Sequence, residues 1–172
     1  AVWREAHGME GGIETPSSAV LKGSTAEVGA YVMGRNMFGG GPGPWPDEPW
    51  NGWWGENPPF HQPVFVVTHH ERPPLECDGG TTFTFVTDGV EEAVAQAREA
   101  AGGRDVAISG GATVARQCLA AGLLDELRLD LVPVLLGDGV RLFDGDTSVD
   151  LEQVSVVEGH GVTHLAFRVQ YA

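Results

Sequence analysis

Two consecutive glycines mark the candidate site with the clearest chemistry. Residues 106–108 are a short apolar run that suits a buried strand, and Ser109, Gly110 and Gly111 follow where the chain must turn. The pattern after Gly111 predicts a helix. Its first backbone N–H groups and the positive end of its dipole would face the glycines, an arrangement that suits a phosphate. The segment therefore indicates a nucleotide cofactor.

A second turn of the same kind supports that interpretation. The two glycines alone also fit a plain strand-to-helix turn, and the sequence has neither G-x-G-x-x-G nor G-x-x-x-x-G-K-[ST]. The apolar run at residues 30–33, however, ends in Gly34, Arg35 and Asn36. Arginine offers a planar fork to phosphate, and Asn36 can cap the turn that follows. Two such turns suit a pyrophosphate with an additional phosphate.

With both turns in view, the chain resembles the dihydrofolate-reductase-like family, specifically the stand-alone relatives of the riboflavin-pathway pyrimidine reductase domain, which is the C-terminal domain of bifunctional deaminase-reductases. The matching segments are AYVMGRNMF at 30–38, PVFVVTHH at 63–70, TTFTFVTDG at 81–89 and the block at 106–143. The resemblance implies one α/β domain over residues 1–172, with a mixed, mostly parallel sheet flanked by helices and a C-terminal antiparallel hairpin.

The resemblance also implies an activity, namely an NADPH-dependent reductase whose cofactor lies across the carboxyl ends of the strands, with two helix N-termini on its phosphates. Thr68 and His69 match the position that meets the adenosine side and its 2′-phosphate. The full set of implied cofactor-binding residues is Gly34, Arg35, Asn36, Thr68, His69, Gly110, Gly111, Ala112, Thr113 and Val114. The alternative is a non-catalytic protein on the same fold that binds a nucleotide or another small ligand.

The expected substrate is a small heterocycle, either a pterin or a pyrimidine-like ring. Its pocket is expected at Trp3, Leu136 and Gly137. Hydride transfer also needs a proton, and no catalytic acid is assigned. Family members open with a strand that ends in a Ser-Leu-Asp-Gly-like turn, which this sequence lacks, so we expect an N-terminal truncation or a variant fold without that strand. In the family the strand lies between residues 106–108 and the strand beginning near Leu127, so these two are expected not to pair directly.

The remaining pattern predicts alternating strands and helices. A helix over 17–28 is expected to begin near Ser17 or Ser18, and Asp88 with Glu91 resembles a capping box. The other expected elements are a helix at 90–101, which Gly102 ends, strands at 64–68, 83–87 and 127–131, and tail strands at 151–157 and 162–169 joined at residues 159–161. Residues 39–63 form a long loop with Trp45, Trp50, Trp53 and Trp54, which either walls an active site or lies at a subunit interface.

Composition limits the partners. The net charge of −14, from 10 basic and 24 acidic residues, argues against nucleic acid, and no apolar run approaches the roughly 20 residues of a membrane span. These limits agree with a cytoplasmic protein that binds a small molecule, and we also expect a homodimer. No metal is expected, since the histidines, among them the adjacent pair His69-His70 and the tail residue His164, suit surface or cofactor-contacting roles. Cys77 and Cys118 are expected to be reduced structural thiols.

Overall fold

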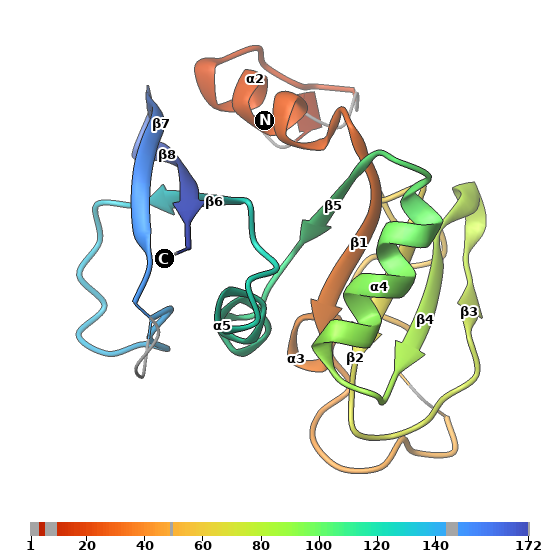
Figure 1. The fold of residues 1–172 in the computed structure, drawn as a ribbon. Helices are drawn as coiled ribbons and strands as arrows, with labels where there is room; N and C mark the ends of the chain where they lie inside the picture. The colour runs from red at the N-terminus through yellow and green to blue at the C-terminus, as the bar shows by residue number, and fades with distance from the viewer. Residues whose placement is uncertain (1–3, 6–9, 49, 144–147, 172) are drawn as a thin grey trace. The chain divides into compact units, whose positions relative to one another are not determined.

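The structure is a computed structural model that describes residues 4–5, 10–48, 50–143 and 148–171 (Figure 1). The chain forms two compact units. The parallel unit is Glu27–Ala121, and the antiparallel unit combines Ala1–Ala26 with Gly122–Ala172. The single domain over residues 1–172 stays a prediction. Within the described ranges, no helix has the length and apolar character needed to cross a membrane.

The parallel unit is built on a five-stranded sheet with the order β3-β4-β2-β1-β5. Its strands are β1 (Val28–Gly34), β2 (Pro63–Val67), β3 (Leu75–Glu76), β4 (Thr82–Val86) and β5 (Asp105–Ile108). β1 pairs in parallel with β2 and β5, β2 pairs in parallel with β4, and β3 is antiparallel to β4. Every residue of β1 is buried, as expected for a central strand of a parallel sheet, whereas the edge strand β5 is half-buried. The predicted mixed, mostly parallel sheet is confirmed.

Helices and a long loop cover this sheet. The helical segments are α3 (Arg35–Phe38), the short η1 (Asp78–Gly80), α4 (Val90–Ala101) and α5 (Ala112–Ala120). α4 lies across one face of the sheet in Figure 1 and ends at Gly102, which has a φ of 61°. The predicted capping box of Asp88 and Glu91 is wrong. Gly89 is the N-cap of α4 and makes no side-chain cap hydrogen bond, because the helix begins one residue later than that motif requires.

The aromatic loop at residues 39–62 is part of the core of the parallel unit. Trp45, Trp54 and Phe60 pack against a buried cluster of the sheet and α3. The main members of that cluster are Val28, Tyr31, Met33, Phe38, Val64, Val66, Phe83 and Phe85. Neither alternative from the sequence foresaw this role. Two of the four tryptophans cover apolar side chains of their own unit, while Trp50 and Trp53 keep 40% and 67% of their surface exposed.

The antiparallel unit contains a helix and a separate three-stranded sheet with the order β6-β8-β7. Its elements are α2 (Pro16–Thr25), β6 (Glu126–Leu131), β7 (Asp150–Gly159) and β8 (Val162–Gln170). The predicted C-terminal hairpin is confirmed as β7 and β8. β6 pairs with β8 in an antiparallel manner and so belongs to this second sheet. β5 is an edge strand of the parallel unit's sheet, and β6 is an edge strand of this one.

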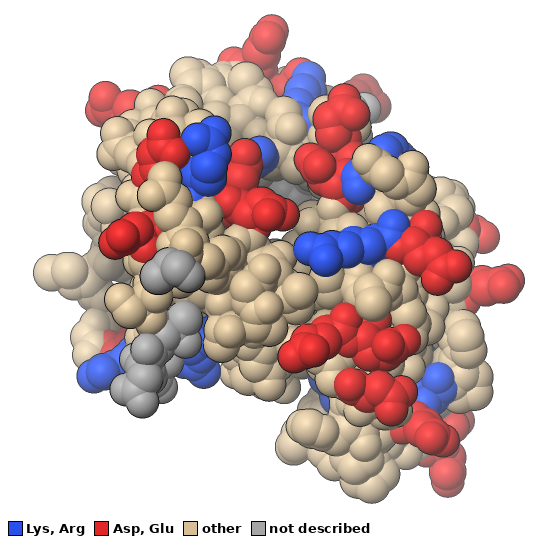
Figure 2. Space-filling model, viewed as in Figure 1, with Lys and Arg blue, Asp and Glu red and all other residues tan. Residues whose placement is uncertain are grey.

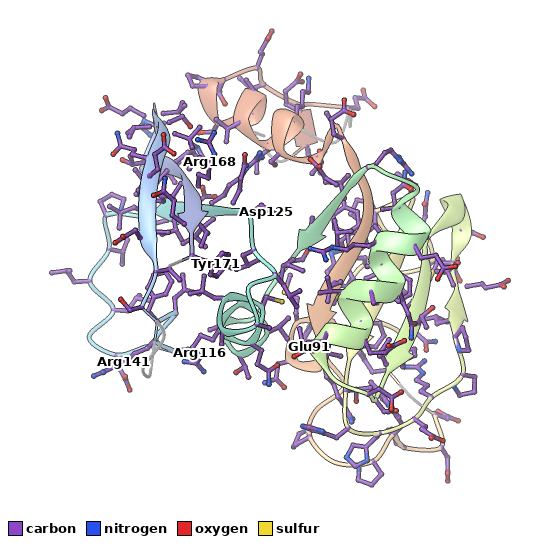
Figure 3. The ribbon with its side chains drawn as sticks, viewed as in Figure 1. Glu91, Arg116, Asp125, Arg141, Arg168 and Tyr171 are labelled. Carbon is purple, nitrogen blue, oxygen red and sulfur yellow. The ribbon has the colours of Figure 1, made fainter. Side chains whose placement is uncertain are left out.

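α2 begins at Pro16, close to Ser17 and Ser18, as the sequence predicted. Thr15 is its N-cap: the Thr15 hydroxyl accepts from the Ser18 N–H at 3.1 Å, and the Ser18 hydroxyl accepts from the Thr15 N–H at 2.8 Å. Tyr171, labelled in Figure 3, directly follows β8. Its hydroxyl accepts from the Leu124 N–H at 3.1 Å and donates to the Leu124 carbonyl at 3.0 Å. The C-terminal end of β8 is thereby held to the segment before β6.

Ser17 takes part in a series of three polar side chains that begins at the exposed Asp130 and ends at two buried groups. Its hydroxyl lies 2.8 Å from Nε2 of His164, whose Nδ1 lies 2.7 Å from Oδ1 of Asp130. The order of groups is that of a hydrolase triad, but Ser17 and His164 are each only 6% exposed. The contacts of Ser17, His164 and Asp130 therefore connect α2 to β8 and β6. The expectation that His164 is a surface or cofactor-contacting imidazole is wrong, because β8 places this residue on its covered face.

Candidate functional site

The two predicted phosphate turns meet at one edge of the parallel sheet. β1 and β5 are parallel neighbours, so the turns that follow them lie at the same end of the unit. The N–H of Gly34 donates to the carbonyl of Gly110 at 2.8 Å. A Cβ added to Gly34 would lie 2.9 Å from Cγ2 of Val114 in the first turn of α5. Glycine at position 34 therefore allows the two turns to pack together.

The N-terminus of α5 is open. Gly111 is its N-cap, and the peptide bond between Gly110 and Gly111 is cis. The positive φ expected at the diglycine belongs to Gly110, at 99°, while Gly111 has a φ of −76°. A Cβ at either glycine would meet no atom within 4 Å beyond its chain neighbours. The first-turn N–H groups of α5 lack intrahelical partners, so they can bind an anion in this space.

Arg35, the first residue of α3, is held by the aromatic loop. Its Cζ lies 3.8 Å from the centroid of the Trp45 ring, and its Nη1 donates to the carbonyl of Gly43 at 2.5 Å. Its Nε and Nη2 atoms are buried and have no hydrogen-bond partner. Burial lowers the pKa of the Arg35 guanidinium from its usual value. Two donors of a cation thus remain to be satisfied by an acceptor.

The end of β2 contributes the predicted adenosine-side residues. Thr68 is buried, and its hydroxyl accepts from the N–H of His70 at 3.2 Å, which shapes the turn. His69 is exposed in this turn, and Asn36 is exposed at the start of α3. The carbonyl of His70 accepts from Nε1 of Trp45 at 3.0 Å. The turn after β2 is therefore attached to the indole on which Arg35 stacks.

Arg72 was missed by the sequence reasoning. Its Cζ lies 4.9 Å from the centroid of Trp45 and 4.8 Å from that of Phe85. Its Nη1 donates to the carbonyl of Trp50 and its Nη2 to Oδ1 of Asn51, both at 2.6 Å. Burial, and after it the positive charge of Arg35, lowers the pKa of Arg72. The available signal was an arginine two residues after the His69-His70 pair, in the segment that follows β2.

The predicted substrate residues lie elsewhere in the chain. Trp3 is outside the described residues. Leu136 is 83% exposed and Gly137 has a φ of 80°, and both belong to the antiparallel unit. A cleft within the parallel unit contains three carboxylates and suits an anion poorly. It is lined by Asn51, Gly52, Gly55, Glu56, Leu75, Glu76, Cys77 and Asp78. Among the residues that the structure describes, no group of three or more metal-ligating side chains is present.

Cofactor phosphates fit the residues at the sheet edge. The open space over Gly110 and Gly111 leaves room for a phosphate at the start of α5, and the unpartnered nitrogens of Arg35 offer charged donors. Among the charged side chains on the face shown in Figure 2, acidic ones are more widespread than basic ones, in agreement with the net charge of −14. Binding of an anion must therefore depend on these local donors and cations rather than on the field of the whole chain.

Comparisons with known proteins agree with this architecture. A family model, the RibD C-terminal domain, matches residues 4–165. A search of curated proteins gave no match. Among solved structures, a protein named for riboflavin biosynthesis from Shewanella sp. PV-4 is 22% identical with a TM-score of 0.64, covering 94% of this chain and 83% of its own. A pyrimidine reductase-like protein from Corynebacterium diphtheriae is 14% identical with a TM-score of 0.56, covering 92% and 83%.

RibD from Acinetobacter baumannii is 18% identical, with a TM-score of 0.60 over 95% of this chain and 53% of that one. At these identities the solved structures establish the shared fold. The family model covers most of the sequence, including the Gly34 and Gly110 turns. The chain therefore belongs to the RibD C-terminal domain family, a reductase family of the riboflavin pathway.

Proposed function

We propose that the chain is an NADPH-dependent reductase that transfers hydride to a small heterocyclic substrate. The observation that carries the proposal is the joined pair of turns. The Gly34 N–H bonds to the Gly110 carbonyl, the open N-terminus of α5 follows, and Arg35 lies at the end of β1 with two unpartnered nitrogens. This arrangement suits a ligand with a pyrophosphate and a further phosphate. NADPH and NADH both have the pyrophosphate, but only NADPH has the further phosphate.

Each residue has a proposed role in binding. The first-turn N–H groups of α5, from Ala112, Thr113 and Val114, would bind the pyrophosphate, and the glycines before them would allow its close approach. Arg35 would bind the 2′-phosphate, with Asn36 and the Thr68-His69 turn beside it. Bound NADPH supplies the hydride, and the chain binds and orients it. The substrate contacts at Trp3, Leu136 and Gly137 stay predictions, as do the homodimer and the cytoplasmic location.

A pyrimidine-like substrate is favoured over a pterin. Support comes from membership in a reductase family of the riboflavin pathway, together with the fold shared with a pyrimidine reductase-like protein. The competing function is a protein that binds the nucleotide without turnover. Such a protein would keep both phosphate turns and would bind NADPH, yet it would not oxidise NADPH with any substrate.

The test begins with titrations of NADPH and NADH, followed by assays of NADPH oxidation with a panel of pyrimidines and pterins. Arg35→Ala should weaken NADPH binding by about 1.5–3 kcal/mol, as expected for a charge-assisted contact, and leave NADH binding nearly unchanged. Arg98→Ala, at an exposed position on α4, is the matched control and should change neither affinity. Equal affinity of the wild type for the two cofactors would contradict NADPH specificity. Binding without oxidation would favour the non-catalytic alternative.

A further inference from the structure

Two guanidinium groups share one indole at the edge of the parallel sheet. Arg35 comes from α3 and Arg72 from the segment after β2, and their Cζ atoms lie 3.8 and 4.9 Å from the centroid of Trp45. Within the described part of the chain, neither arginine forms an ion pair with a carboxylate. In a sequence with 24 acidic and 10 basic residues, such a pair without a counter-charge is unexpected.

The repulsion between the two cations is not neutralised. The positive charge of Arg35 is one of the causes that lower the pKa of Arg72, the larger cause being burial. Partial burial strengthens such a repulsion, because less water screens the two charges. Both side chains are nevertheless fixed in place. The Gly43 carbonyl holds Arg35, and the Trp50 carbonyl and the Asn51 side chain hold Arg72. The aromatic loop thus holds two like charges close together at a cost in free energy.

A doubly charged anion would remove that cost. Arg35 has two buried nitrogens without a hydrogen-bond partner, so an anion that reaches them would satisfy both donors. The terminal nitrogens of Arg72 already donate to the loop, so Arg72 would act mainly through its charge. A phosphomonoester carries close to two negative charges near neutral pH and can interact with both cations.

We infer that Arg72 is a specificity-determining residue of the cofactor site, which together with Arg35 selects a cofactor carrying a 2′-phosphomonoester. This inference rests on the proposed function, because it assigns a second cation to the same phosphate. In this scheme the aromatic loop fixes Arg72 against Trp45, and the charge of Arg72 favours NADPH over NADH.

The experiment measures the affinity ratio of NADPH to NADH in four proteins: the wild type, Arg72→Gln, Arg72→Lys and the control Arg98→Gln. Arg72→Gln should lower the ratio about tenfold, while Arg72→Lys, which keeps the charge without the planar fork, should retain most of it. A merely structural role would weaken both cofactors equally and leave the ratio unchanged. The same series with 2′,5′-ADP and 5′-AMP as probes confines the comparison to the adenosine end.

The outcomes separate the inference from the proposal on which it rests. If the wild type does not prefer NADPH, the proposed cofactor specificity fails. If the wild type prefers NADPH and Arg35→Ala abolishes that preference, but Arg72→Gln keeps the full ratio, the role of Arg72 alone is overturned. Equal losses of the ratio in Arg72→Gln and Arg72→Lys would also overturn it, since the charge would then not be the cause. A smaller salt dependence of NADPH binding in Arg72→Gln than in the wild type would support it.

Discussion

The N–H of Gly34 donates to the carbonyl of Gly110 at 2.8 Å, so two turns that are 76 residues apart in the sequence form one structural unit. A hydrogen bond two residues earlier extends this contact, because the Ser109 N–H donates to the Val32 carbonyl, also at 2.8 Å. The last residues of β1 and β5 are thereby paired up to the point where both helices begin. A substitution in either turn should consequently alter the structure of the other turn.

Gly34→Ala tests this contact. The new Cβ would lie 2.9 Å from Cγ2 of Val114, which is buried in α5 and has a restricted rotamer. We expect the free energy of unfolding to fall by about 1–3 kcal/mol, the usual cost of overpacking. The double variant Gly34→Ala/Val114→Ala should lose less than the sum of the two single variants, because it removes one partner of the clash. Denaturant unfolding of all four proteins measures this coupling, and strict additivity would contradict it.

Gly111→Val should abolish cofactor binding in a domain that still folds. The backbone at this position has a negative φ, which an L residue can adopt, and the side chain would enter the open space over the start of α5. A phosphate could then no longer approach the first-turn N–H groups. Titration with NADPH and circular dichroism measure the two effects.

Gly23→Ala is the control for this variant. Gly23 is an exposed residue in α2 with free space around its Cα, so alanine should leave NADPH binding intact and stabilise the helix by roughly 0.5–1 kcal/mol. An unchanged dissociation constant in Gly111→Val would mean that the diglycine serves only as a turn.

Ser17→Ala should destabilise the protein, because we expect Ser17 to have a structural role and no catalytic one. The substitution leaves the buried Nε2 of His164 without its partner, which costs about 1–3 kcal/mol. Ser24→Ala provides the comparison, because the Ser24 hydroxyl only donates to the Leu21 carbonyl within the same helix, and its loss should cost less than about 0.5 kcal/mol. Chemical denaturation of both variants and the wild type measures the two losses in free energy of unfolding. Equal free energies of unfolding in the two variants would show that the Asp130-His164-Ser17 chain contributes nothing to stability.

Cys118 should be inert in the folded protein. Burial raises the pKa of its thiol to about 11 from an ordinary 9.0, so little of the reactive thiolate is present near neutral pH. Cys77 is half-buried, and its pKa is raised by burial and by the charge of Asp78, so it should react slowly. At about pH 8, a thiol reagent followed by mass spectrometry should modify Cys77 first and Cys118 only after denaturation.

The raised pKa of Cys118 also predicts how the free energy of unfolding depends on pH. Above the ordinary pKa of 9.0, the unfolded thiol loses its proton while the folded thiol of Cys118 keeps it until about 11. The free energy of unfolding should therefore fall as the pH rises through this window. Cys118→Ala should make the fall smaller. An identical pH profile in the two proteins would show that the thiol does not titrate as proposed.

The parts of the fold that depend on local sequence could be predicted. The buried run of β1 ends at Gly34 where a turn was expected, and the diglycine precedes a helix, because apolar runs and glycines act within a few residues. The residues that cap the helices were harder to predict from the sequence. Gly89 rather than Asp88 is the N-cap of α4, because neighbouring residues can each serve as a cap and tertiary packing selects between them.

Contacts between distant residues could not be predicted from the sequence. The pairing of β6 with β8, which builds the second sheet, is a contact between distant segments that hydrophobic periodicity does not report. The position of His164 on the covered face of β8, against Ser17, depends on how α2 packs. Arg72 was missed because only the folded loop brings it to Trp45. Local pattern thus located the glycine turns, whereas the charged groups around them required the tertiary structure.

The position of Trp45 also provides a built-in optical probe. Its indole is in contact with both guanidinium groups and donates to the His70 carbonyl, so its emission depends on the charges and dipoles around it. An anion that binds to these cations would change the electric field across the ring. The intrinsic fluorescence of the protein should therefore respond to occupancy of the site, without a label and without turnover.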